Sequence, residues 1–128
     1  MAKNSRIFIA FAIEDKTLRD FLVGQAKNEK STFSFVDMSV KEPWDSQWKA
    51  NCRTKLKGCD GVIGVITKNT KWAEGQLWEL QCAYDERIPV LLIYGSRDDR
   101  PASLPEPVKD RRILNWTWDS IKAFLDRL

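Results

Sequence analysis

Short apolar runs alternate along this chain with segments in which apolar residues recur every three or four positions. The runs Arg6–Phe11, Val62–Ile66 and Pro89–Gly95 are almost entirely apolar, which is typical of parallel strands that are covered on both faces. We predict a shorter strand with alternating aromatic residues over Thr32–Asp37 and a last strand over Arg112–Trp116. The chain is therefore expected to contain five strands.

Between these strands the spacing of apolar residues predicts four helices. Asp15 can cap the first helix, either Asp45 or Ser46 the second, and Thr117 the last, because these side chains accept hydrogen bonds from helical N–H groups. Gly58 is well placed to end the second helix. On three of these helices the apolar residues form a stripe that is expected to face the core. These residues are Leu18, Phe21, Leu22 and Ala26 on the first helix, Trp48, Cys52 and Leu56 on the second, and Ile121, Phe124, Leu125 and Leu128 on the last.

The order of these elements predicts an α/β fold. Strands that alternate with helices form a doubly wound parallel sheet, and five strands suit the flavodoxin-like order 2-1-3-4-5 in a three-layer sandwich. The proline-rich segment Ser96–Asp110 is expected to be mostly loop. The whole chain, residues 1–128, is interpreted as one domain.

Composition narrows the classes of function. Of the 128 residues 43% are hydrophobic and 30% are charged, and the net charge is +3. This charge is too small and too dispersed to predict nucleic-acid binding, and no apolar run is long enough for a membrane span. The start of the chain enters a predicted strand directly, so we expect a cytoplasmic protein.

The chain has no histidine, which excludes Ser-His and Cys-His nucleophiles and most zinc sites. Its three cysteines lack the spacing of zinc ligands, and we interpret them as small core residues. We therefore expect no metal and no bound cofactor. Any catalysis must use carboxylates, hydroxyls, lysines or the backbone.

In a doubly wound sheet a ligand binds at the carboxyl ends of the strands where the winding reverses, here between strands 1 and 3. The chain lacks GxGxxG and GxxxxGK[ST], and Thr67 stands where a receiver domain has its phosphorylated aspartate. The helix that begins near Gly75 starts beside the same crevice. Glu79, about one turn into it, stands at the edge of an apolar stripe, where it is either an ordinary helix-surface carboxylate or part of a site.

Several segments in order resemble one family. "RIFIAFAIEDKTLRDFLV", "FVDMSVKEPWDSQWK", "CDGVIGVITKNTKW" and "LWELQCAYDERIPVLLI" are similar to the Toll/interleukin-1 receptor (TIR) domains, and most similar to the short bacterial TIR-like proteins of Thoeris antiphage defence. The resemblance covers the chain from Arg6 to the last helix. It implies a TIR-like fold and an enzyme that cleaves NAD as its substrate, forming a signal derived from ADP-ribose for an effector protein.

The resemblance also implies roles for individual residues. Glu79 matches the catalytic glutamate of the family, and Trp72 lies seven residues before it, whereas the tryptophan that many catalytic TIR domains have four residues before is replaced here by Gly75. The residues expected to bind substrate, from the loops after strands 1, 2 and 3, are Phe11, Ala12, Asp37, Ser39, Asn69 and Trp72.

Loop 38–47 corresponds to a family loop that makes assembly contacts, so we expect self-association through it. Trp44 in this loop and Trp78 are the expected interface residues, although each could instead pack inward. The alternative function is a TIR-like interaction module without catalysis, and a receiver-like regulatory domain is a third interpretation. Histidine is not required for the enzyme, because nicotinamide leaves as a neutral base and one carboxylate can stabilise the oxocarbenium-like transition state.

Overall fold

The computed structural model describes residues 5–31, 33–38 and 41–128. Strands and α-helices alternate in it, with two short 3₁₀ helices, η1 and η2, at the loops that follow β1 and β3. The elements are β1 (Arg6–Ala10), η1 (Ile13–Asp15), α1 (Lys16–Asn28), β2 (Ser34–Val36), α2 (Ser46–Lys57), β3 (Gly61–Ile66), η2 (Thr70–Trp72), α3 (Glu74–Asp85), β4 (Val90–Tyr94) and α4 (Trp118–Asp126).

The strands form a parallel sheet in the order β2-β1-β3-β4. This confirms the predicted α/β fold with strand 3 inside the sheet. The fifth strand is reduced to one bridge, in which Leu114 donates to the Leu92 carbonyl (2.9 Å) and accepts from the Tyr94 amide (3.0 Å). Two residues further on, the indole of Trp116 donates to the side-chain oxygen of Gln25 in α1 at 2.8 Å.

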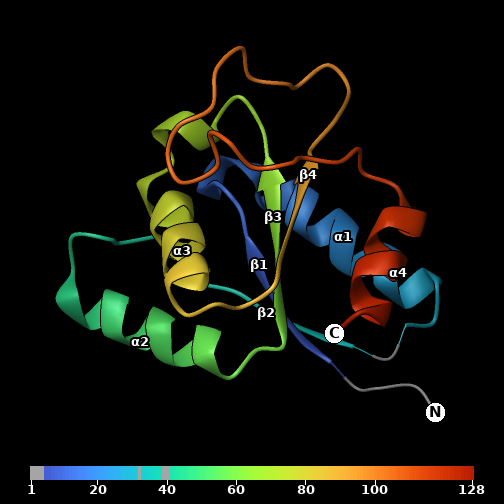
Figure 1. The fold of residues 1–128 in the computed structure, drawn as a ribbon, viewed down its shortest axis with the longest axis horizontal. Helices are drawn as coiled ribbons and strands as arrows, with labels where there is room; N and C mark the ends of the chain where they lie inside the picture. The colour runs from blue at the N-terminus through green and yellow to red at the C-terminus, as the bar shows by residue number, and fades with distance from the viewer. Residues whose placement is uncertain (1–4, 32, 39–40) are drawn as a thin grey trace.

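Two helices cover each face of the sheet (Figure 1), which confirms the predicted three layers. The α2 and α3 helices pack on the face that carries Phe8 and Val62, and α1 and α4 pack on the face that carries Ile7 and Ile63. Every residue of β3 is buried, as its apolar sequence predicts. The two helical layers cover both faces of the sheet and leave the carboxyl ends of the strands accessible for a site.

Several local expectations are confirmed and two are wrong. Asp45 and Thr117 cap α2 and α4 through their side chains, and the segment Ser96–Asp110 is turn and loop without an α-helix. Asp15 stands at the N-cap of α1, but its carboxylate caps nothing. Phe21 does not belong to the inward stripe of α1, since 64% of it is exposed.

No helix of the described ranges has the length and apolar character that a membrane span requires.

Candidate functional site

The carboxyl ends of β1 and β3 meet beneath the start of α3, where the sequence predicted a site. Gln76 of α3 holds this junction together: its Nε2 donates to the carbonyl of Ala10 (3.0 Å) and to that of Val65 (2.7 Å). Because both bonds need a donor, the Oε1 of Gln76 must point the other way, and it has no partner within the described residues although it is buried. Sequence reasoning missed Gln76, whose only signal was its position one turn before Glu79.

Glu79 lies one helical turn further along α3 and is fully buried. This excludes the interpretation of Glu79 as a surface carboxylate at the start of a helix. One oxygen, Oε2, accepts from the ammonium of Lys41 at 2.7 Å, and the side chain of Lys41 is only 6% exposed. The other oxygen, Oε1, has no partner among the described residues. The site thus contains a buried ion pair whose carboxylate keeps one free acceptor.

Lys41 was not predicted, because it lies 38 positions before Glu79 in the chain. It reaches the carboxylate by passing directly over Gly75, where an added Cβ would stand only 2.6 Å from the Cβ of Lys41. A tryptophan at position 75, as in many catalytic relatives of the resembled family, could not coexist with this path. The glycine at position 75 was therefore the feature of the sequence that indicated a different neighbour here, which the structure shows to be the side chain of Lys41.

Burial and charge act against each other at Glu79. The pKa of Glu79 is raised to about 8, because the upward effect of burial, with a smaller upward effect from the charge of Asp37, exceeds the lowering by Lys41. The thiol of Cys52 also faces this region, and burial together with the charge of Glu79 raises the pKa of that thiol. Lys41 is therefore the main group that favours the ionised form of the carboxylate.

A small hollow of about 190 Å³ opens beside this ion pair. Trp44 and Trp72 line it, and each is 77% exposed. Gln76 and Lys41 line it as well, so the hollow leads from two exposed aromatic rings towards the buried polar groups. Two exposed tryptophans beside such groups are suited to stacking on a planar ring.

The predicted substrate-binding residues fall into two groups. Phe11 is buried, and its ring centroid lies 4.2 Å from the Lys41 ammonium, so Phe11 belongs to the site. Trp72 also belongs to it. Ala12 is buried in the turn after β1, where its carbonyl accepts from the Asp15 amide at 2.8 Å. Ser39 lies outside the described residues.

Asp37 and Asn69 are engaged in contacts within the protein. Asp37 accepts from the guanidinium of Arg19 at 2.9 Å. Asn69 donates to one oxygen of Asp15 at 2.9 Å, and the hydroxyl of Thr67 donates to the other at 2.5 Å. Asp15 therefore joins the loop after β3 to the loop after β1.

Trp78 differs from the expectation of an exposed interface residue. It is partly buried, packs edge-on against Trp48 with ring centroids 5.5 Å apart, and is covered by the guanidinium of Arg53. The direction of Trp78 towards α2 explains this, because α2 supplies both neighbours. Trp44, in contrast, is exposed as the interface interpretation requires.

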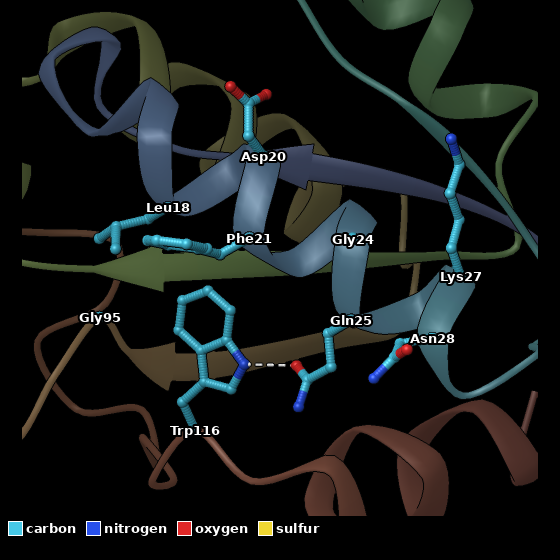
Figure 2. A pocket seen from close by; sticks show the side chains of 9 residues that line it. All are labelled: Leu18, Asp20, Phe21, Gly24, Gln25, Lys27, Asn28, Gly95 and Trp116. Carbon is cyan, nitrogen blue, oxygen red and sulfur yellow. Dashed lines mark hydrogen bonds between the residues drawn. The ribbon is translucent and has the colours of Figure 1, made fainter.

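A larger hollow, of about 850 Å³, lies against α1 (Figure 2). Its one carboxylate, Asp20, is 63% exposed, and its indole, Trp116, is already bound to Gln25. Among the described residues the buried side-chain oxygens without a partner are those of Gln76 and Glu79. The hollow at α1 is the larger of the two. The hollow at α3 is the better candidate for a functional site, because the buried oxygens of Gln76 and Glu79 lie at it or beside it.

The described residues contain no group of three or more histidine, cysteine, aspartate or glutamate side chains that could hold a metal ion.

Comparison with known proteins supports the fold. The structure is similar to the TIR domain of the Toll-related receptor TRR-2 from Hydra magnipapillata, with a TM-score of 0.62 and 17% identity over 94% of this chain and 91% of that one. It is also similar to a prokaryotic SEFIR domain, with a TM-score of 0.51 and 13% identity over 97% of this chain and 89% of that one. The chain has a TIR-like fold.

At these identities the TIR-like likeness describes the fold and not the activity. No protein-family model matches the sequence. No curated protein matches it either. Evidence for a function of this TIR-like chain must therefore come from the geometry of its own site.

Proposed function

We propose that this TIR-like protein cleaves NAD, releasing nicotinamide and forming a product derived from ADP-ribose. The observation that carries the proposal is the carboxylate of Glu79, which is fully buried at the strand ends yet keeps one oxygen without a partner among the described residues. The neighbouring hollow, lined by Trp44 and Trp72, supplies aromatic surface for a planar base.

The reaction needs few groups from the protein. The bond between ribose C1′ and the pyridinium nitrogen breaks, and its electron pair neutralises the positive charge of the leaving nicotinamide. Positive charge develops on the ribose, and the ionised form of Glu79, whose fraction increases as the pH rises through its pKa of about 8, stabilises that charge more strongly than water would. Water then adds to C1′ and releases a proton, or a ribose or adenine group adds instead and gives a cyclic product. Glu79 would act as the catalytic residue in either case.

Two features favour Glu79 over the other carboxylates near the strand ends. Asp15 is held by two donors, and Asp37 is held by Arg19, so both serve contacts within the fold. In addition, the carboxylate of Glu79 already pairs with a positively charged group, the ammonium of Lys41. The resemblance to bacterial defence proteins extends the proposal to a nucleotide signal that is read by an effector protein.

The test compares nicotinamide release from NAD by the wild type and by Glu79→Gln over a range of protein concentrations. Loss of a preorganised electrostatic contact typically lowers the rate by about 10²–10³. Asp85→Asn is the matched control, because Asp85 lies exposed at the far end of the same helix. Circular dichroism on all three proteins separates lost chemistry from lost folding.

Wild-type turnover by Glu79→Gln would refute the catalytic role. Absence of nicotinamide release by the wild type at every concentration would favour the second candidate function, a protein-interaction module. The specific observation behind that candidate is the exposure of both Trp44 and Trp72, since exposed tryptophans are common anchors of protein interfaces.

A further inference from the structure

The Lys41 ammonium is held by two features that together form a cation-binding site. The carboxylate of Glu79 lies 2.7 Å from Nζ, and the face of the Phe11 ring lies 4.2 Å from it. A negative charge and an aromatic face both attract a cation, and burial strengthens each attraction. These groups would bind any cation of suitable size, not only a lysine of the same chain.

The space around this cation is closed to a large ligand. Glu79 is fully buried, Lys41 is 6% exposed, and the adjoining hollow of about 190 Å³ is smaller than the roughly 300–1,000 Å³ of typical ligand pockets. Lys41 lines the hollow and stands between it and the carboxylate. A substrate that enters the hollow therefore meets the lysine first.

We propose that Lys41 is an internal competitor, which occupies the cation site between Glu79 and Phe11 and must leave before a pyridinium cation can bind there. The proposal rests on the proposed function for the class of its ligand, the cationic pyridinium ring of NAD. Exchange of one cation for another keeps the buried carboxylate compensated throughout, whereas simple loss of the lysine would leave a buried charge unpaired. The flexible four-carbon stem of lysine allows the ammonium to swing towards solvent.

The test uses two small ligands that differ in charge and cannot be cleaved as NAD is. They are 1-methylnicotinamide, a pyridinium cation, and nicotinamide, its neutral counterpart, each titrated by NMR into the folded protein. Lys41→Met removes the ammonium and keeps an unbranched side chain. The titrations are made at pH 9, because the pKa of Glu79 is about 8 in the wild type and Lys41→Met removes the charge that lowers it. At this pH we expect Lys41→Met to bind the cation at least about tenfold more tightly than the wild type does, with less than about a threefold change for nicotinamide, and the gain for the cation should increase with pH.

A second variant displaces the lysine without removing its charge. In Gly75→Ala the added methyl group would stand 2.6 Å from the Lys41 Cβ, which is too close, so the substitution should disturb the present path of the lysine to Glu79. Alanine also favours a helix over glycine by about 1 kcal/mol, so the substitution should not weaken α3 itself. We expect it to increase affinity for the cation in the same direction as Lys41→Met, although by less.

Lys122→Met is the matched control, because Lys122 pairs with Asp126 at 2.8 Å in an exposed position on α4. It should leave both affinities unchanged. Equal affinity of the wild type and Lys41→Met for the cation, or equal gains for cation and neutral ring, would overturn the proposal. Neither ligand requires NAD cleavage, so failure of the cation site and failure of the proposed enzyme activity are separate results.

Discussion

Glu79 shows how one residue can be unfavourable for folding and useful for chemistry. A buried carboxylate loses its hydration, and the single ammonium of Lys41 replaces only part of it, because Oε1 has no partner among the described residues. Proteins rarely retain such a group in a core without a role for it. The free-energy cost of burying this charge therefore falls at the position where the proposed reaction would use a negative charge.

The stability of the protein should depend on pH through this residue. Because the pKa of Glu79 is raised from 4.5 to about 8, the folded state holds the proton more tightly than the unfolded chain does. The resulting stabilisation is fully present below about pH 4.5 and is lost as the pH rises through about 8. Glu79→Gln carries no titrating carboxyl here, so it should gain roughly 3–5 kcal/mol relative to the wild type between pH 5 and pH 9.

Urea unfolding of both proteins at several pH values measures this difference in the free energy of unfolding. The comparison cancels the contributions of titrating groups that do not interact with Glu79, because both proteins share them. A difference that stays constant from pH 5 to pH 9 would show that Glu79 titrates normally.

At the scale of elements, the segment before α2 must place Lys41 while it also starts a helix. The Asp45 carboxylate accepts from the Gln47 amide at 2.8 Å, and the Asp45 amide donates to the Glu42 carbonyl at 2.9 Å. Pro43 between them is buried. The helix cap therefore fixes the end of the loop whose other end carries the lysine.

Asp45→Ala should destabilise the protein by about 1 kcal/mol, because it removes the side-chain cap of α2. The sequence left Asp45 and Ser46 as equal candidates for this cap, so Ser46→Ala is the natural control and should change the stability by less than about 0.5 kcal/mol. Chemical denaturation of the two variants gives the comparison. A larger loss for Ser46→Ala would mean that the cap is assigned to the wrong residue.

At the scale of the whole molecule, the periodicity of the sequence was enough to predict the layers and the parallel order of the sheet, and the topology then indicated where a candidate site would lie. Buried strands such as β3 are uniformly apolar, and this pattern depends only on local sequence. The pairing of Lys41 with Glu79 could not be predicted, since it depends on how a loop packs across Gly75. The fifth strand is reduced to the single bridge between Leu114 and Ile93, and its last residue, Trp116, bonds to Gln25 of α1, a contact that local sequence does not reveal.

The exposed aromatic residues of the whole molecule lie on separate surfaces. Trp44 and Trp72 flank the hollow at α3, whereas Phe21 lies beside the hollow at α1 (Figure 2). If the protein self-associates through loop 38–47, the first surface should be covered in the assembly and the second should not. A neighbouring subunit at Trp44 would also lie next to Lys41 and the entrance of the site.

We therefore expect Trp44→Ala to weaken self-association and to lower NAD cleavage at a given protein concentration. Its melting temperature should stay nearly unchanged, because a side chain that is 77% exposed contributes little packing energy. Phe21→Ala, at a residue that is 64% exposed on the other surface, is the control and should alter neither property. Sedimentation velocity gives the association and thermal unfolding gives the stability. Equal effects of the two substitutions on association would place the contact elsewhere, and a large loss of stability in Trp44→Ala would make that residue part of the core.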